Sequence, residues 1–499
     1  MKSSFDVVVI GSGFGGSLLA TILQSSGLAV GLLDKSSHPR FAIGESSTPA
    51  ADFLLEEIAN TYDLEELRPL VRFGSWRQEH PEILCGCKRG FSYFWHGESS
   101  GFQACPSHPH ELLVAANGSR EQADTQWYRP DVDQYFVNVA KSRGVEVVEN
   151  AQVTSIEHGG LRDWKVTYLS DGRETSCQAS FLVDASGPAG VVMNHLQISD
   201  TTNTLSTTSH AVYSHWENLP PLSQWLTSQG ASLEDYPYPI EDSVIHHLFR
   251  DGWMWQIRFE NDRQSLGFVF ADVPAETQQN PEQLWSNTVR YHPVLSEMLA
   301  GSQLATFPGR LFQTHRLQRL RSQAAGEDWA ALPFTLGFID PLHSTGIAQT
   351  LYGVHRLAQI LLNKSVPDLL PALQEYSRET LAQFRLLDDL ISSCYLGLRD
   401  FRLFTVMSML YFAAATTFEQ RWLGESLLES GFLLADDNRF REVVSDSKTE
   451  LTELVSIPGL PDEAINQFSK QMKDRIEPWN SVGLFAPEVP RMYRYTAAK

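Results

Sequence analysis

The sequence contains few cysteines and no pattern that would organise them. Five occur among 499 residues, at positions 85, 87, 105, 177 and 394, and they form neither a CxxC pair nor an even disulfide framework. The histidine pairs His108/His110 and His246/His247 are not accompanied by HExxH or by paired Cys/His spacing. We therefore predict packing thiols, a reducing cytoplasmic location and no metal site.

Basic side chains and long apolar runs are also scarce. With 39 basic and 60 acidic residues the formal charge is −21, which disfavours binding to nucleic acid or to anionic membranes. The longest apolar run, 404–418, is shorter than the roughly 20 residues that span a bilayer. Four glycines between Gly11 and Gly16 interrupt the N-terminal apolar stretch, so that it does not resemble a signal peptide. We expect a globular protein with no membrane or nucleic-acid partner.

The first 34 residues predict a strand, a glycine turn, a helix and a second strand. Gly11, Gly13 and Gly16 form GxGxxG between the strand and the helix, where glycines permit close backbone approach to a pyrophosphate. Asp34 ends the second strand, where its carboxylate can accept from a ribose hydroxyl. The pattern predicts a dinucleotide site, against the alternative of a glycine turn without ligand, and does not choose between NAD and FAD.

The rest of the chain contains two kinds of residue pattern, one typical of strands and one typical of helices. Short alternating segments such as SVIHHLF, WMWQIRFE and SLGFVFAD predict a half-buried antiparallel sheet, and helical spacing dominates from about Val366. We predict a discontinuous nucleotide-binding core over 1–365, with an inserted substrate-facing sheet at about 76–118 and 200–300. A helical C-terminal region follows over 366–499.

Three later segments carry a resemblance to a known family. HPRFAIGESSTP (38–49), FLVDASG (181–187) and LGFIDPLHSTG (336–346) resemble the flavin-dependent halogenases in order and spacing, over about the first 360 residues. The resemblance implies FAD and an α/β fold: an FAD-binding doubly wound domain, glutathione reductase-like or PHBH-like, with an inserted antiparallel sheet and a helical C-terminal region. The cofactor positions it implies are Gly11, Gly13, Phe14, Gly16, Asp34, Lys35, Gly44, Glu45, Ser46, Arg129, Val153, Asp184, Asp340 and Ile347.

The segment CGCKRGFSYFWH contains Lys88. A lone lysine is most often a solvated surface charge, but this segment is similar to the KxGxSY form found in family members that act on phenols, pyrroles and other free aromatic substrates. The resemblance implies that Lys88 is the catalytic lysine. Its ammonium would polarise the halogen–oxygen bond of hypohalous acid, or its amine would form a haloamine. The ordinary lysine pKa of about 10.4 favours the ammonium unless burial lowers it.

Two further family positions lie in the turn before a predicted helix. The backbone N–H groups of Thr345 and Gly346 are the family's halide cradle, although they could equally donate to the flavin pyrimidine ring. Several tryptophan-acting members have glutamate where this chain has His343. That histidine could accept the ring proton or could be structural, and its role stays open.

The stretch GWMWQIRF contains the family's tryptophan motif. Trp253 and Trp255 share one face of a strand, and in the family they keep organic substrate away from the flavin. The alternative is that they are two large core residues. The usual motif is GWxWxIP, so Arg258 replaces a proline and is left without an explanation.

Together these features predict a two-component halogenase. Only one dinucleotide motif is present, so we expect reduced FAD to come from a separate NAD(P)H-dependent reductase, with chloride or bromide as co-substrate. The product would be a halogenated electron-rich aromatic small molecule, phenolic or indolic/pyrrolic, of specialised metabolism. The alternatives are a single-component aromatic monooxygenase or related flavin reductase, which would oxidise NAD(P)H directly, and a flavin-binding protein without activity.

Overall fold

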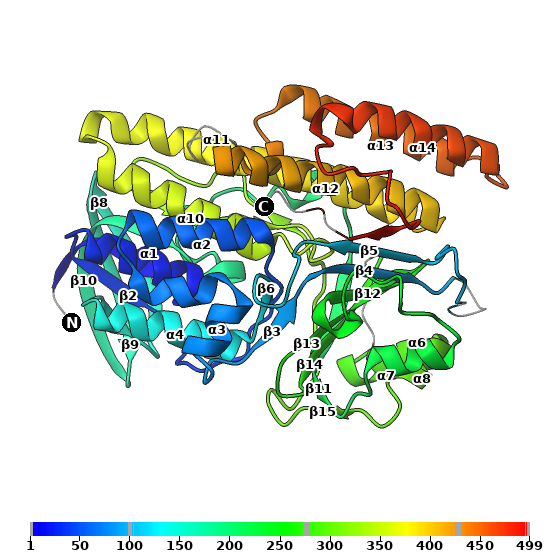
Figure 1. The fold of residues 1–499 in the computed structure, drawn as a ribbon. Helices are drawn as coiled ribbons and strands as arrows, with labels where there is room; N and C mark the ends of the chain where they lie inside the picture. The colour runs from blue at the N-terminus through cyan, green and yellow to red at the C-terminus, as the bar shows by residue number, and fades with distance from the viewer. Residues whose placement is uncertain are drawn as a thin grey trace.

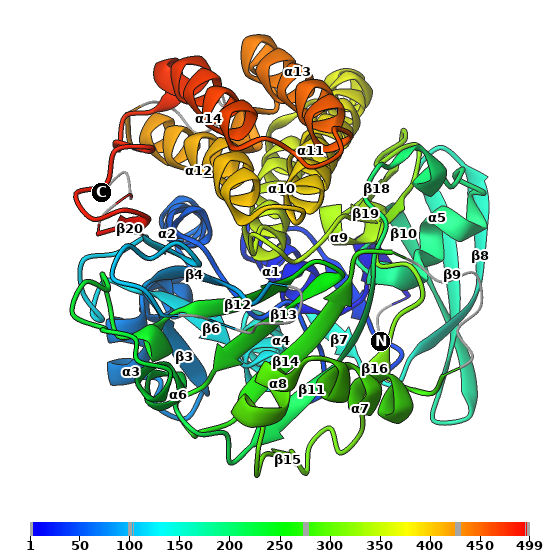
Figure 2. The same cartoon turned by 90° about the vertical axis from the view of Figure 1, so that its right-hand side faces the viewer.

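The computed structural model describes residues 3–97, 102, 104–272, 279–424, 431–494 and 496. Two sheets lie side by side beneath a layer of C-terminal helices (Figures 1 and 2). One sheet carries the N-terminal glycine turn, and the other is formed mainly by the middle of the chain. The fold is the mixed α/β architecture that the sequence predicts.

The first sheet has the order β7-β2-β1-β10-β9-β8, with β18 also paired to β10. Strands β7, β2, β1, β10 and β18 are parallel to one another, and β9 and β8 continue the sheet in antiparallel register. Helices α1, α4 and α10 pack together against it. The bounds are β1 Ser4–Ile10, α1 Phe14–Ser25, β2 Val30–Leu33, α4 Arg129–Ser142, β7 Glu146–Val148, β8 Gln152–Gly160, β9 Asp163–Ser170, β10 Arg173–Asp184, α5 Val191–His195, β18 Trp329–Ala331, α9 Pro333–Leu336 and α10 Gly346–Asn363.

The second sheet has the order β15-β11-β14-β13-β12-β4-β5-β20, with β16 paired to β11. It is antiparallel except where β4 meets β12 and β20 meets β5. Its elements are β4 Gly90–Trp95, β5 Glu111–Ala115, β11 His210–Glu217, α6 Leu222–Ser228, β12 Val244–Phe249, β13 Gly252–Arg258, β14 Gln264–Phe270, α7 Pro281–Tyr291, α8 Pro293–Met298, β15 Gln303–Leu304, β16 Phe312–Gln313 and β20 Met492–Tyr493.

The expectation of a half-buried sheet is wrong for its central strands. Every residue of β12 is buried, as are all but the last residues of β13 and β14. Met254, Leu266 and Phe268 point into a second core formed with α6, α7 and α8, and the opposite face packs on the main core. Alternation failed as a guide because the polar members of these strands, among them His247 and Gln256, are hydrogen-bonded to each other inside the protein.

The C-terminal region is helical, as predicted. Its helices are α11 Val366–Gly397, α12 Phe401–Gly424, α13 Asn438–Val455 and α14 Asp462–Ile476. Helix α12 is long and apolar enough to cross a membrane, but 78% of its most apolar window is buried within the protein. It is therefore a core helix, and it packs against α11, α14 and α2.

The remaining short elements connect the two sheets. Strand β3 pairs with β6, and β17 pairs with β19. Helix α2 lies between α10 and α12. The bounds are α2 Pro49–Thr61, α3 Phe73–Glu79, β3 Cys85–Lys88, β6 Asp124–Trp127, β17 Arg319–Leu320 and β19 Gly337–Phe338. Thr48 is the N-cap of α2 and Pro49 its first residue, as expected, but the Thr48 hydroxyl makes no capping hydrogen bond.

Candidate active site

Three cavities run from the glycine turn to the second sheet and form one channel. The outer cavity has a volume of about 80 Å³, the middle cavity about 270 Å³ and the wide cavity about 340 Å³. Arg40 and Ser186 line both the outer and the middle cavity, whereas Gly44 and Ile347 line both the middle and the wide cavity. The shared walls make the three cavities continuous.

Asp34 is fixed at the outer cavity by several donors. Its Oδ2 accepts from the Ser12 amide at 2.7 Å and from the Arg40 guanidinium at 3.2 Å, and its Oδ1 accepts from the Ser36 amide at 2.9 Å. Burial acts to raise the pKa of Asp34, but Arg40 and the hydrogen bonds outweigh it and hold the pKa below its usual value. The side chain is therefore an ionised acceptor at the end of β2.

The three motif glycines are required for two different reasons. A Cβ on Gly11 would lie 2.2 Å from the Ala185 oxygen, and one on Gly16 would lie 2.0 Å from the Gly11 oxygen, so both positions exclude a side chain by close backbone packing. A Cβ on Gly13 would find only the Arg129 guanidinium, at 4.0 Å, and would project into the middle cavity. A ligand can thus approach the backbone at Gly13 without obstruction.

The other predicted cofactor residues line the channel with one exception. Gly11, Lys35 and Val153 line the outer cavity; Phe14, Gly16 and Arg129 line the middle cavity; Glu45, Ser46 and Asp340 line the wide cavity. The exception is Asp184, whose carboxylate accepts from the Ser186 hydroxyl and from the Val192 and Met193 amides. It orders the loop behind the cavity, where its neighbours Ala185 and Ser186 form the wall.

Arg129 ties the strap of residues 43–48 to helix α4. Its Nε and Nη2 donate to the two Asp133 oxygens at 2.8 and 2.9 Å, and its Nη1 donates to the Ile43 and Gly44 carbonyl oxygens at 2.8 and 3.1 Å. The guanidinium also lies over the Phe14 ring, 4.9 Å from the centroid. Arg129 therefore sets the position of the strap relative to the glycine turn.

Trp253 and Trp255 form one side of the wide cavity, and their strand explains Arg258. Trp253, Trp255 and Ile257 alternate along β13 and all line the cavity. Residues on the other face of β13 point away, so Arg258 lies outside the cavity, where its guanidinium pairs with Asp262. Replacing the motif proline by arginine changes the end of a strand and leaves the tryptophan wall unaltered.

A chain of hydrogen bonds joins this wall to the C-terminal helices. The Trp253 indole N–H donates to the Tyr395 hydroxyl at 3.0 Å, and that hydroxyl donates to Asp340 Oδ2 at 2.9 Å. Ser209 also donates to this oxygen, at 3.1 Å. Burial raises the pKa of Asp340 to about 7 despite these donors. Tyr395 lies on α11, and no motif in the sequence marked it.

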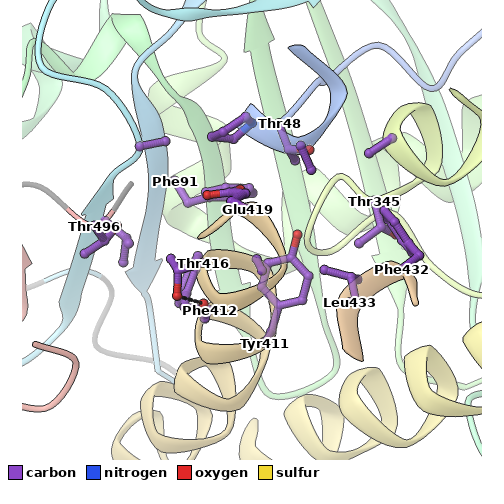
Figure 3. A pocket seen from close by; sticks show the side chains of 16 residues that line it. Thr48, Phe91, Thr345, Tyr411, Phe412, Thr416, Glu419, Phe432, Leu433 and Thr496 are labelled. Atoms are coloured by element: carbon purple, nitrogen blue, oxygen red, sulfur yellow. Dashed lines mark hydrogen bonds between the residues drawn. The ribbon is translucent and has the colours of Figure 1, made fainter. Parts of the chain in front are cut away.

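A fourth cavity, which we call the inner cavity, lies under α12. Its volume is about 30 Å³. Figure 3 shows its lining residues, which come from the strap, α2, β4, β5, the start of α10, α12, residues 432–433 and Thr496. The lining is mostly apolar, and the one charged side chain among its described residues is Glu419, which is buried. The residues are Thr48, Pro49, Ala50, Phe91, Val114, Ala116, Thr345, Ala348, Tyr411, Phe412, Ala415, Thr416, Glu419, Phe432, Leu433 and Thr496.

Lys88 is buried between the channel and the inner cavity. Its Nζ donates to the Ser47 carbonyl oxygen in the middle of the strap, and Ser46 lines the wide cavity whereas Thr48 lines the inner one. The same Nζ lies 3.9 Å from the centroid of Phe91, which is part of the inner cavity wall. Lys88 itself lines neither cavity, but its contacts place it beside both, and the lysine motif alone could not establish this position.

The charge state of Lys88 follows from its surroundings. Burial lowers the pKa of Lys88 to about 7, although the carboxylates of Asp124 and Asp52 act in the opposite direction. Asp124 is its partner in the β3–β6 pair, and Asp52 lies on α2. Near neutral pH the side chain is thus present both as the ammonium and as the amine, so it can donate a proton and take one back.

The turn before α10 separates the same two cavities. Thr345 lines the inner cavity, whereas Ser344 and Gly346 line the wide one. Ser344 has a left-handed φ of 57°, and Gly346 is the first residue of α10. The amides at this helix start have no acceptor within the helix and carry its positive end, which suits an anion.

His343 is held at both ring nitrogens. Its Nδ1 pairs with the Tyr93 hydroxyl at 3.0 Å, its Nε2 lies 3.5 Å from the Cys394 sulfur, and its ring stacks on Tyr411 at 4.2 Å. Burial lowers the pKa of His343 well below its usual value, with His246 and Lys88 acting in the same direction. The histidine is a neutral packing residue behind Lys88, so the structure favours the structural alternative.

The glycine turn and the channel define an α/β dinucleotide-binding protein, and the inner cavity lies beside the wide end of that channel. Residues 126–399, more than half of the chain, match the family model of tryptophan halogenase. The chain is 27% identical to the monodechloroaminopyrrolnitrin halogenase of Pseudomonas fluorescens, over 95% of this chain and 85% of that protein. It is 28% identical to the tetracycline 7-halogenase of Kitasatospora aureofaciens, over 72% of this chain and 63% of that protein.

Solved structures show the same fold. Halogenase PltM in complex with phloroglucinol and FAD has a TM-score of 0.85 at 24% identity, over 99% of both chains, and the flavin-dependent brominase Bmp2 has 0.60 at 19% identity, over 94% of this chain and 98% of that one. The chain belongs to the tryptophan halogenase family of flavin-dependent halogenases, and FAD is its cofactor. The channel fits FAD: Gly13 leaves it open, and among the described residues the buried Ser46 Oγ and Arg40 Nε have no hydrogen-bond partner.

The lowered pKa of Lys88 predicts a pH-dependent stability. An unfolded lysine has a pKa of about 10.4, so between pH 7 and pH 10 the unfolded chain binds more protons at Lys88 than the native protein does. The free energy of unfolding should therefore rise with pH in this window because of Lys88. We expect the wild type to gain stability over Lys88→Met as pH rises from 7 to 9.5 in urea titrations; a constant difference would mean that the lysine has its ordinary pKa.

Proposed function

We propose that Lys88 delivers hypohalous acid to an electron-rich aromatic ring bound in the inner cavity. The observation that supports this best is the position of its Nζ, which is bound to the strap between the wide cavity and the inner cavity and lies against Phe91. Its surroundings exclude water, so a polarising N–H group there acts in a low dielectric.

The halide site and the oxidant belong to the wide cavity. Reduced FAD, together with O₂ and chloride or bromide, supplies hypohalous acid. The N–H groups of Thr345 and Gly346 bind the halide at the start of α10, on the turn between the two cavities. Hypohalous acid formed at this turn needs to move only past the strap to reach Lys88.

The halogenation step at Lys88 needs no oxidant other than hypohalous acid. The new carbon–halogen bond forms as the halogen–oxygen bond breaks, and the Lys88 ammonium gives a proton to the leaving hydroxide, which becomes water. The ring carbon then loses its proton to the Lys88 amine, which restores the ammonium. A pKa of about 7 suits both transfers because neither form of the side chain is strongly preferred at neutral pH.

Trp253 and Trp255 keep the organic substrate out of the channel. They fill one wall of the wide cavity, and the bond from Trp253 to Tyr395 fixes its indole ring. The close contact of Trp255 with Gly267, where a Cβ would lie 2.1 Å from the indole, leaves it no room to retract. Direct oxygenation of the ring is thereby prevented, which disfavours the monooxygenase alternative.

The lining of the inner cavity defines the substrate class. Phe91 and Phe412, whose rings meet edge to face with centroids 5.6 Å apart, give the cavity an aromatic wall, and Glu419 is its buried carboxyl group. The site therefore suits an aromatic ring that directs an O–H or N–H donor towards Glu419, such as a phenol or a pyrrole. A carboxylate that accepts from this group also raises the electron density of the ring. This favours phenolic and indolic/pyrrolic substrates of specialised metabolism.

The inner cavity must widen to admit a ring. Its 30 Å³ falls well short of the roughly 150 Å³ of a cavity that binds benzene. Part of its wall is strained, because Leu433 and its neighbour Leu434 both have left-handed φ values, 51° and 64°. We infer that the ring enters by displacing the side chains of this segment.

Reduced FAD comes from a separate reductase. The described residues contain one dinucleotide-binding βαβ unit, and it is the one that forms the FAD channel, so no second unit is available there for NAD(P)H. A cytoplasmic enzyme would meet such a reductase, and the five free cysteines suit that compartment.

Replacing Lys88 by methionine should abolish halogenation and leave FAD binding intact. Methionine fills a similar volume but cannot donate to hypohalous acid. The assay combines the protein with FAD, an unrelated flavin reductase, NADH, bromide and a panel of phenols and indoles, and detects bromine isotope pairs by mass spectrometry. We expect a loss of at least a hundredfold.

The control in this assay is FAD binding, measured by flavin fluorescence. Continued bromination by Lys88→Met with normal FAD binding contradicts the proposed role of the lysine. Oxygen added to the ring without any reductase would instead support a single-component monooxygenase.

Glu419→Gln should separate phenols from their methyl ethers. Loss of a hydrogen bond to a charged acceptor costs about 1.5–3 kcal/mol, or roughly ten- to a hundredfold in binding. We expect KM for a phenol that the enzyme brominates to rise by that factor, and KM for its O-methyl analogue to stay unchanged. Thr416→Val is the control, since the Thr416 hydroxyl already donates to the Phe412 carbonyl. Equal effects on both substrates would exclude Glu419 as the anchor.

A further inference from the structure

A further cavity, lined mainly by polar side chains, lies at the C-terminal end of β4 and the N-terminal end of α12. Its volume is about 470 Å³, and four arginines contribute to its lining. We call it the arginine cavity. The lining residues are Trp95, Gly97, Pro109, His110, Arg250, Arg399, Asp400, Phe401, Arg402 and Arg491. Neither the FAD channel nor the inner cavity includes any of them.

The charge in the arginine cavity is positive, against a net charge of −21 for the chain. Among the lining residues that the structure describes, Asp400 is the single acidic one. Both of its oxygens accept from Arg402, which also pairs with Asp462 at 2.9 Å. Arg402 is thus largely neutralised. The described wall contains four arginines and one carboxylate, so it carries an excess of positive charge.

Two of the arginines are anchored by hydrogen bonds to backbone carbonyl groups. Arg491 Nη1 donates to the His108 carbonyl oxygen at 3.2 Å, and Arg399 Nη1 donates to the Val455 carbonyl oxygen at 3.4 Å. A guanidinium has five N–H donors, so each keeps several for a ligand. Burial lowers the pKa of Arg491, and the nearby charge of Arg402 lowers it further, so an anion placed among them would relieve this repulsion.

Two more features favour an organic anion. The N-terminus of α12, which begins at Phe401, adds the positive end of a helix of 24 residues. Trp95 and Phe401 stack at 6.2 Å with 15° between their planes, so part of the wall is flat and apolar. The cavity is far larger than one inorganic ion, and its mixed lining suits a molecule that carries an oxyanion on an organic body.

We propose that the arginine cavity binds the phosphate or carboxylate group of an organic molecule. It shares two elements with the inner cavity. Phe91 and Trp95 lie four residues apart on β4, about 13 Å, and Phe401 and Phe412 lie eleven residues apart on α12, about 17 Å. An anion bound here occupies the same β4–α12 interface as the aromatic substrate, at its solvent-facing end.

Calorimetric titration of the purified protein at low salt tests the site without any turnover. The probes are inorganic pyrophosphate for the phosphate source and citrate for the carboxylate source. We expect saturable binding of at least one probe, and the tighter probe identifies the source. Arg250→Gln and Arg399→Gln should each weaken that binding at least tenfold. Both side chains are exposed, so the variants should fold, which a thermal melt checks.

Arg439→Gln is the matched control. Arg439 is an arginine of α13 whose guanidinium lies over Trp479, away from the arginine cavity. Binding that is weakened by the two cavity variants and unchanged by the control supports the proposal. Absence of saturable binding by both probes, or equal weakening by all three variants, overturns it.

Discussion

The hydrogen bond from Lys88 Nζ to the Ser47 carbonyl oxygen is the contact on which the site depends. It fixes the buried amino group of Lys88 at the strap, and the strap separates the FAD channel from the inner cavity. Burying a lysine is costly, and here the cost appears as a pKa of about 7. Asp52 and Asp124 limit that cost. In the proposed reaction the same burial is an advantage, because it makes the proton of Lys88 available at neutral pH.

The elements around this contact form a rigid frame. Arg129 joins the strap to α4 and to the Phe14 ring, so the glycine turn and Lys88 share one support. On the far side of the channel, Tyr395 joins the tryptophan wall to Asp340 and thus to the C-terminal helices. Helix α11 carries Tyr395 and packs against α12, which lines the inner cavity, so the two sides of Lys88 are held by neighbouring helices. Such preorganisation lets polar groups act without rearranging during the reaction.

The sequence predicted what is local and missed what is assembled over long distances. GxGxxG, Asp34 and the alternating face of Trp253 and Trp255 follow from short-range geometry, and the channel lining agrees with them. The family likeness named Lys88, but only the fold gives its burial. Tyr395 and Glu419 lie on long helices, where one polar residue among many has no distinguishing spacing.

Other misses have the same origin. The sheet was expected to be half-buried because its residues alternate, yet its polar side chains are bonded inside a second core. Arg258 looked like a departure from the family until alternation along β13 put it on the face away from the cavity. The wrong expectation for the sheet and the open question about Arg258 both come from judging a strand without knowing what covers each of its faces.

The central claim is that the aromatic ring and FAD lie on opposite sides of Lys88. A crystal structure of the protein with FAD and a bromophenol tests it directly, because the anomalous signal of bromine locates the ring. The account predicts the bromine under α12, in the inner cavity beside Phe91 and Phe412, with Lys88 Nζ between it and the flavin. Bromine in the wide cavity, against Trp253 and Trp255, would contradict the account.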